Sequence, residues 1–370
     1  MIKLPKERLY SLDALRGFDM FWIAGGAMIF FFFSESTDVS WIDWVSYQCH
    51  HAEWDGFRFY DLIFPLFLFI AGVSFPFSLD SRKRRGQPRS RIYRHVFQRG
   101  IVLVILGLVY NGLLRFDFEN LRFASVLGRI GLAWMFAALI VMNSRLFWQV
   151  VWLLVILFGY WAAMMLIPVP GYGAGDLSME GSLAGYIDRA LVPGKLYLDV
   201  HDPEGLFSTI PAIGTAMLGM LTGHLLKIKQ VYLNNWRKLG IMTASGIVLI
   251  LLAILWDLAF PINKNLWTSS FVLVAAGISL LLLSFFYLIN DIWKIRGWAF
   301  PFVVIGLNPI TIYLTQAGMI DFWNTAEYFF GGLIETLTST FQDFWMAAAF
   351  FLVSWLFLYF LYKKKIFLKV

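Results

Sequence analysis

The chain alternates between long apolar runs and short polar loops. Ten runs are apolar over about 20 residues, the length that a helix needs to cross a bilayer. The runs cover residues 12–33, 61–79, 97–115, 123–143, 146–167, 205–227, 238–258, 266–288, 298–318 and 342–362. A further segment, 319–335, is aromatic and mildly amphipathic, which predicts an interfacial or re-entrant helix. The pattern predicts an all-α, polytopic membrane helix bundle with about ten transmembrane helices in one domain over residues 1–370.

Composition supports this class. Hydrophobic residues make up 59% of the chain and charged residues only 15%, against about a quarter charged in soluble domains. The net charge of +6 is spread over short loops, so it does not predict nucleic-acid binding. The single cysteine, Cys49, excludes an internal disulfide framework and a cysteine-based metal site, and no metal is expected.

Basic residues lie in alternate loops, which predicts the orientation. Lys and Arg gather before the first run, in 80–99, at 145, in 227–238, in 294–296 and after the last run, while most acidic residues lie in the other loops. By the positive-inside rule both termini are cytoplasmic, and the outer loops are 34–60 and 168–204. The inner basic loop 80–99 is either a topology signal that also meets membrane lipid or a site for a phosphorylated ligand.

One outer stretch concentrates titratable groups. His50 and His51 are adjacent, carboxylates follow at Glu53, Asp55 and Asp61, and an apolar run begins directly afterwards. Imidazole exchanges protons or acts as a nucleophile near neutral pH, and a carboxylate at the head of a helix could orient it. The alternative is an ordinary polar loop between two membrane helices.

Ionisable residues inside the apolar runs are also candidates for function. Asp13, Arg16 and Asp19 are three residues apart on the first run, where they either neutralise one another or serve a function. Arg129 lies inside an apolar run and needs a partner from another helix or a ligand anion. Asn308 precedes a proline that frees backbone carbonyls, so it either repairs the break or faces a cavity.

Two further motifs stand at helix starts. Asp202 and Glu204 lie where the sixth run opens, and acids there favour the helix dipole, so capping would explain them. Lys264 precedes the eighth run, where it could be a simple interface residue.

Six of these stretches together resemble the heparan-α-glucosaminide N-acetyltransferase family of transmembrane acyltransferases, in its bacterial branch. They follow the family's order along nearly the whole chain. The matching stretches are Arg8–Gly17, His51–Gly56 running on to Asp61–Pro65, Leu121–Arg122 with Val126–Arg129, Asp202–Gly205, Asn263–Trp267 and Gly306–Asn308. The chain departs from the family at Asp55, where an asparagine is usual, and it lacks a Gly-rich run before His51.

The resemblance implies an acetyl-CoA-dependent N-acetyltransferase. It would move an acetyl group from cytoplasmic acetyl-CoA to the amine of a glucosamine-type sugar on the far side of the membrane. His51 matches the family's active-site histidine and Asp61 a nearby acidic position, so we expect His51 rather than His50 to carry the chemistry. His51 would be either the nucleophile or the general base, and both roles stay open.

The same matches suggest binding residues. Those expected at the acceptor sugar are Trp54, Asp55, Asp202, Glu204, Asn263 and Lys264. Those expected at acetyl-CoA are Arg16, Arg129 and Asn308 from these matches. The inner basic loop adds Arg82, Arg84 and Arg85, whose charges would meet the phosphates of acetyl-CoA. The bacterial branch implies the bacterial inner (cytoplasmic) membrane as the location.

A homodimer is an open alternative to a monomer. Two other functions also remain open. One is a membrane O-acyltransferase that modifies a hydroxyl of a surface glycan or lipid, and the other is an amino-sugar transporter, to which the intramembrane charges and the broken ninth run are suited. An amine acceptor would distinguish an N-acetyltransferase from an O-acyltransferase. Binding of acyl-CoA would distinguish an acyltransferase from a transporter.

Overall fold

A computed structural model describes residues 9–229 and 233–368 of the protein, and its regular structure is helical. Nine helices within the described residues are long and apolar enough to cross a membrane. They are Tyr10–Glu35, Phe59–Arg84, Arg89–Tyr110, Val126–Asn143, Leu146–Leu166, Thr209–Lys227, Asn235–Asp257, Ser269–Ile292 and Ser339–Lys364. The prediction of an all-α, multi-pass membrane protein is confirmed.

The chain divides into two compact units, each assembled from segments distant in sequence. The first unit takes the N-terminal segment as far as His51, the short segment Arg58–Ile63, and the chain from Leu282 onward. Its helical elements are α1 (Tyr10–Phe21), η1 (Trp22–Gly26), α2 (Ala27–Glu35), α3 (Ser40–Gln48), η2 (Phe59–Leu62), the end of α11 (Ser269–Tyr287), η4 (Leu288–Ile292), α12 (Phe300–Gly306), α13 (Pro309–Leu314), η5 (Thr315–Met319), α14 (Phe322–Ile334), η6 (Ser339–Phe341) and α15 (Gln342–Lys364).

The first apolar run of this unit is a broken helix. Between α1 and α2 the turn η1 widens to π-helical geometry, and Gly25 adopts φ +116°, which a residue with a Cβ rarely adopts. Before the break, α1 lies directly against α12: a Cβ on Gly17 would come within 1.6 Å of the carbonyl oxygen of Phe302. These two features fix the course of the segment that leads to α3 and His51.

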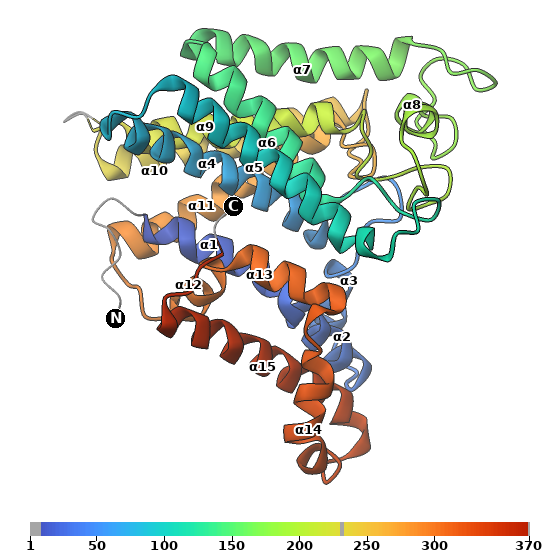
Figure 1. Ribbon diagram of the computed structural model, residues 1–370, viewed down its shortest axis with the longest axis vertical. Helices are drawn as coiled ribbons and strands as arrows, with labels where there is room; N and C mark the ends of the chain where they lie inside the picture. Colours follow the sequence, from blue (N-terminus) through green and yellow to red (C-terminus); the bar gives the residue numbers. More distant parts are fainter. Residues whose placement is uncertain (1–8, 230–232, 369–370) are drawn as a thin grey trace. The chain divides into compact units, whose positions relative to one another are not determined.

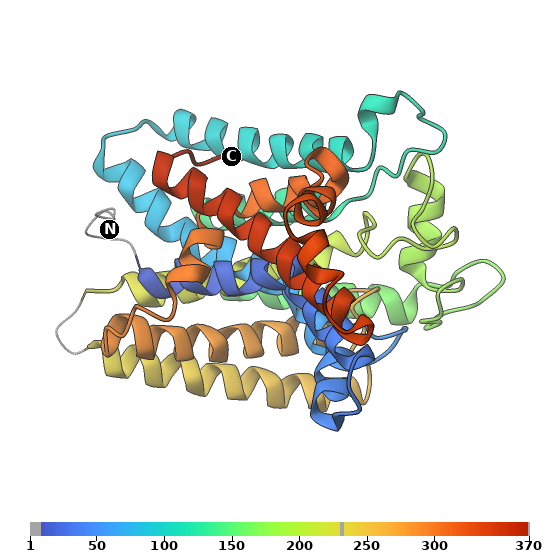
Figure 2. The same ribbon diagram turned by 90° about the horizontal axis from the view of Figure 1, so that it is seen from below.

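The second unit holds the remaining helices (Figure 1). They are α4 (Ile63–Arg84), α5 (Arg89–Tyr110), η3 (Leu113–Arg115), α6 (Val126–Asn143), α7 (Leu146–Leu166), α8 (Leu183–Leu191), α9 (Thr209–Lys227), α10 (Asn235–Asp257) and most of α11 (Ser269–Tyr287). The buried indole N–H of Trp134 on α6 donates to the carbonyl of Ala71 on α4, over 3.3 Å. Figure 2 shows α10 running beside α11.

The structure corrects two expected boundaries and contains one further expected helix. The run 298–318 is not one helix, because α12 ends at Gly306 and α13 begins at Pro309, which has no N–H to continue the backbone pattern. This break accounts for nine long helices instead of ten. The run 205–227 begins as a helix only at Thr209. The segment 319–335 contains the expected separate helix, α14.

Candidate active site

The first candidate group is an imidazole–carboxylate pair in the first unit. Nδ1 of His51 lies 2.7 Å from Oδ1 of Asp61. The Asp61 carboxylate is buried, while the His51 side chain is half exposed. The sequence-based expectation that these two residues meet is correct in geometry.

Local structure holds this pair in place. Asp61 is the third residue of the turn η2, and its Oδ2 accepts the backbone N–H of Arg58 over 2.9 Å. The guanidinium of Arg58 donates to the carbonyl of His51 over 2.7 Å, and the next N–H, that of Phe59, donates to the side-chain carbonyl of Gln48. These hydrogen bonds connect the turn η2 and the preceding Arg58 to Gln48, at the end of α3, and to His51.

The neighbouring histidine has a different environment. The ring of His50 stacks on Phe31 with 4.4 Å between centroids. The ring of His51 instead lies against Tyr60, at 4.9 Å, and faces a carboxylate. The geometry thus distinguishes two histidines that the sequence places side by side.

The second group lies in the second unit, around the segment Ala52–Phe57. Asn263 donates its side-chain amide to Asp55 over 3.1 Å, and the N–H of Gly56 donates to Ile262 over 2.8 Å. The indole N–H of Trp54 donates to Leu177 over 3.0 Å. Three of the expected acceptor residues, Trp54, Asp55 and Asn263, therefore gather on one segment and the turn before α11.

Two other residues complete this neighbourhood. His201 is buried, its ring meets that of Trp54 edge to face at 5.3 Å, and its Nε2 lies 3.1 Å from the carbonyl of Asn265. Burial lowers the pKa of His201, against the smaller opposing effect of this carbonyl. Lys264, expected at the acceptor, is partly buried in the same turn.

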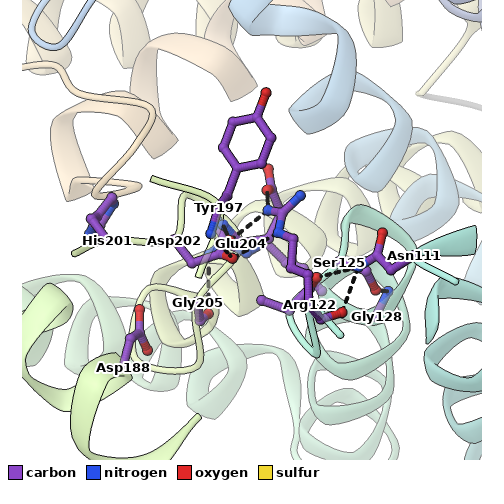
Figure 3. A network of polar contacts seen from close by, with 12 residues as sticks. Asn111, Arg122, Ser125, Gly128, Asp188, Tyr197, His201, Asp202, Glu204 and Gly205 are labelled. Carbon is purple, nitrogen blue, oxygen red and sulfur yellow. Dashed lines mark hydrogen bonds and ion pairs between the residues drawn. The ribbon is translucent and has the colours of Figure 1, made fainter. Parts of the chain in front are cut away.

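The third group is an ion network, drawn in Figure 3. Arg122 donates through Nε and Nη2 to the two oxygens of Asp202, over 2.7 and 2.6 Å, and also contacts Glu204. The ring of Tyr197 covers the guanidinium at 4.5 Å, and the Tyr197 N–H donates to Asp202. Burial acts to lower the pKa of Arg122, but the hydrogen bond and charge of Asp202, with the charge of Glu204, raise it overall.

This network changes the interpretation of two sequence motifs. Asp202 and Glu204 do not cap a helix, because α9 begins at Thr209 and Ser208 is its N-cap residue. Asp202 is buried, and it already accepts bonds from Arg122 and from backbone N–H groups. A role for the two acids in binding the acceptor stays a prediction.

Sequence reasoning gave Arg122 no role, although a basic residue in an acidic outer loop was a signal. Asp188 was also missed. Its Oδ1 accepts the N–H groups of Leu206 and Phe207, over 2.8 and 3.4 Å. Burial raises the pKa of Asp188 to about 6, against the opposing effect of these two bonds.

Arg129 finds partners on the segment before α9. It is buried, and its Nη2 donates to the carbonyl of Gly205 over 3.1 Å and to the hydroxyl of Ser208. Its guanidinium lies 4.8 Å from the ring centroid of Trp267. Nε and Nη1 have no hydrogen-bond partner among the residues that the structure describes, so this buried cation has donors left for a water or a ligand.

Two expected acetyl-CoA residues lie in the first unit. Arg16 pairs with Asp13 at 3.4 Å and approaches the carbonyl of Gly306 at 3.5 Å. The side-chain amide of Asn308 donates to Ile366 over 3.0 Å and accepts from the N–H of Leu368 over 3.1 Å. These two bonds hold the Asn308 side chain against the C-terminal segment.

The basic loop supplies the last expected group. Arg84 lies 2.6 Å from Asp80, Arg82 donates to Gln87 over 3.2 Å, and Arg85 is exposed. The Nε of Arg82 is buried without a hydrogen-bond partner in the described part of the chain. These side chains present several N–H donors at one end of α4.

Fold and site together define a multi-pass α-helical membrane protein that carries an imidazole–carboxylate pair at the head of a membrane helix. Residues 8–254 match the family model described as heparan-alpha-glucosaminide N-acetyltransferase, catalytic. The chain belongs to this family of membrane acyltransferases, and its matched region includes His51, Asp61 and the Arg122 network.

Curated relatives agree with this assignment. The chain is 27% identical to heparan-alpha-glucosaminide N-acetyltransferase of Mus musculus over 99% of its own length, and 28% identical to that of Homo sapiens over 86%. These alignments cover 62% and 55% of the two relatives, so the chain spans about 55–62% of their length.

Proposed function

We propose that this protein transfers an acetyl group from cytoplasmic acetyl-CoA to the amine of a glucosamine-type sugar on the opposite side of the membrane. The observation that supports this most directly is the 2.7 Å pair of His51 and Asp61 in a chain of the acyltransferase family. An acetyltransferase that acts on an amine needs a base, because a sugar amine is mostly protonated near neutral pH.

The contact with Asp61 supports Nε2 of His51 as the nitrogen that acts as the base. An ionised carboxylate only accepts hydrogen bonds, so the pairing with Asp61 requires that Nδ1 of His51 carries a proton. Nε2 is then the basic nitrogen. The buried negative charge of Asp61 also stabilises a positively charged ring, as the aspartate does in a catalytic triad.

Two routes use this same nitrogen. In direct transfer, Nε2 takes a proton from the sugar ammonium, the amine attacks the thioester carbon, the C–N bond forms, the C–S bond breaks, and the thiolate takes up a proton. In the two-step route, Nε2 attacks the thioester carbon, the bond to Nε2 forms as the C–S bond breaks, and the thiolate takes up a proton. The sugar ammonium then loses a proton to water, and the amine displaces Nε2 from the acetyl carbon. Both routes release one proton overall for each ammonium that is acetylated.

The remaining residues suit the two substrates. Trp54 and Asp55 lie on the segment that directly follows His51, and Asn263 donates to Asp55. An aromatic ring with neighbouring carboxylate and amide groups is suited to a sugar. For the donor, the nucleotide phosphates of CoA require charge-assisted N–H donors. The guanidinium groups of Arg82, Arg84 and Arg85 provide them, and Arg82 has a buried Nε that lacks a partner among the described residues.

The test is an acetylation assay. Purified protein would be given acetyl-CoA labelled in the acetyl group together with a panel of glucosamine-bearing sugars and matched sugars that have a hydroxyl in place of the amine. The proposal expects label only on the amino sugars, in an amide bond that survives mild alkali. Alkali-labile label would indicate an ester and an O-acyltransferase, whereas sugar uptake into vesicles without acetylation would indicate a transporter.

Sidedness is tested separately by cysteine labelling. With Cys49 replaced by serine, single cysteines at Ser90 in the basic loop and Ser178 in the long outer loop are expected to react from opposite sides of sealed vesicles. Labelling of both positions from one side contradicts the proposed transfer across the membrane.

A further inference from the structure

A cavity of about 350 Å³ lies between the start of α7 and the end of α9, far in sequence from the residues assigned above. It is lined by Leu146 and Gln149 from α7, by His224 and Lys227 from α9, and by Ile228. Apolar and polar side chains thus meet at one place, at the ends of two helices that are long enough to cross a membrane.

Gln149 contributes a hydrogen-bond acceptor. The residue is only 4% exposed, and its amide nitrogen donates to the carbonyls of Val141, over 3.3 Å, and Ser144, over 2.9 Å. These two carbonyls fix the orientation of the amide, because a flipped amide would turn its oxygen toward them. The side-chain oxygen is buried and has no partner among the described residues, and leaving such an atom unpaired is costly.

The α9 side contributes donors. Nε2 of His224 is buried and likewise lacks a hydrogen-bond partner in the described part of the chain. Lys227 extends its ammonium to within 2.9 Å of Asp80, which also holds Arg84 at 2.6 Å. The cavity therefore offers N–H donors for an anionic group beside one amide oxygen that needs a donor.

The outer surface of α7 is apolar. Its first turn exposes Leu146, Phe147 and Trp148 by 60, 70 and 56%, and Trp152 and Val155 continue the exposed apolar surface along the helix. Figure 1 shows α7 along one border of its unit. Acyl chains can lie on such a surface while a headgroup lies at the helix end, the depth at which aromatic and basic side chains anchor membrane helices.

We propose that this cavity binds the headgroup of a membrane phospholipid in which the phosphate is joined to a group with an N–H or O–H donor, such as ethanolamine or glycerol. The phosphate accepts from His224 and Lys227, and the ethanolamine or glycerol group donates to Oε1 of Gln149. A choline headgroup has the same phosphate but no N–H or O–H, so it leaves the Gln149 oxygen unpaired. The bound lipid stabilises the packing of α7 on α9.

Native mass spectrometry of the full chain in detergent tests this, with phosphatidylethanolamine and phosphatidylcholine of identical acyl chains at equal concentration. One hydrogen bond to a buried acceptor changes a binding constant by about tenfold. We therefore expect about tenfold more retained phosphatidylethanolamine, and a higher unfolding temperature in its presence. Gln149→Leu should remove the preference between the lipids, and His224→Ala should reduce the binding of both.

The control variant is His95→Ala, which changes another half-buried histidine near the basic loop and should keep the full preference. Tryptophan fluorescence would establish that each variant is folded before lipid binding is compared. Equal retention of the two lipids by the wild type, an unchanged preference in Gln149→Leu, or unchanged binding of both lipids in His224→Ala would show ordinary annular lipid and overturn the proposal.

A competition experiment distinguishes a bound lipid from a bound soluble phosphate compound. Millimolar O-phosphoethanolamine and coenzyme A carry phosphate but have no acyl chains in the bilayer. Failure of both to displace the bound phosphatidylethanolamine supports a lipid site. Displacement by either one would assign the cavity to a soluble phosphate compound and contradict the lipid assignment.

Discussion

Asp188 allows a quantitative prediction about the ion network beside α9. Its carboxylate is buried on α8, and it accepts backbone N–H groups of Leu206 and Phe207 through Oδ1. Its Oδ2 has no hydrogen-bond partner in the described part of the chain. Burial raises its pKa to about 6, even though the two hydrogen bonds and the charge of Arg129 oppose the rise.

The sign of the effect on stability follows from linkage. An aspartate in an unfolded chain has a pKa near 3.9, so the folded protein binds this proton more tightly than the unfolded chain does. The stabilisation from the bound proton is complete below pH about 3.9 and is lost as the pH rises through about 6. A pKa difference of about two corresponds to about 3 kcal/mol.

The substitution Asp188→Asn isolates this contribution. Asparagine keeps an oxygen that accepts from Leu206 and Phe207, but it cannot ionise. At pH 7.5 we expect the variant to be more stable than the wild type, by up to about 3 kcal/mol. At pH 4 the two proteins should be nearly equal, because Asp188 is then protonated.

The assay is thermal unfolding in detergent, followed by tryptophan fluorescence between pH 4 and 8. The matched control is Asp199→Asn, since the Asp199 side chain is 82% exposed and should leave the pH profile unchanged. Parallel pH profiles for the wild type and Asp188→Asn would refute the reasoning, as would a variant that is less stable at pH 7.5.

Four further predictions concern the candidate active site and its supports. His51→Ala should lower turnover by at least about 10²–10⁴-fold while acetyl-CoA binding, measured by calorimetry, persists, whereas His50→Ala should stay close to wild type; a fully active His51→Ala would contradict the proposed chemistry. Asp61→Asn should lower turnover less than His51→Ala, so equal losses would indicate that the pair acts as one unit. Arg122→Gln should destabilise the protein by about 3–5 kcal/mol in thermal unfolding, because it leaves the buried Asp202 charge unpaired. Alanine substitutions across Arg82–Arg85 should raise the KM for acetyl-CoA more than the KM for the sugar, and an unchanged donor KM would leave these residues as topology and lipid contacts.

The sequence predicted the membrane helices well because bilayer thickness sets their length and the exclusion of charge marks their ends. It did not predict the π-helical break at Trp22–Gly26, since two glycines inside an apolar run leave its hydropathy almost unchanged. It placed Pro309 inside a helix, whereas the structure ends one helix before this residue and begins another at it.

Contacts between candidate site residues could be predicted from the sequence only where the two residues are close along the chain. The contact between His51 and Asp61 spans ten residues and a single turn, so local pattern was enough to suggest it. The contact between Arg122 and Asp202 spans 80 residues. Hydropathy contains no information on which loops meet, so the sequence suggested a cap for Asp202 where the structure has an ion pair.

The segment Ala52–Phe57 connects the proposed base to the proposed acceptor residues along the chain. It is bonded to His51 at one end and to Arg58 at the other, and the Arg58 guanidinium also donates to the His51 carbonyl over 2.7 Å. Between these ends, Trp54, Asp55 and Gly56 are each hydrogen-bonded to another part of the second unit. The proposed base and the proposed acceptor residues are therefore separated by only three peptide bonds between His51 and Trp54.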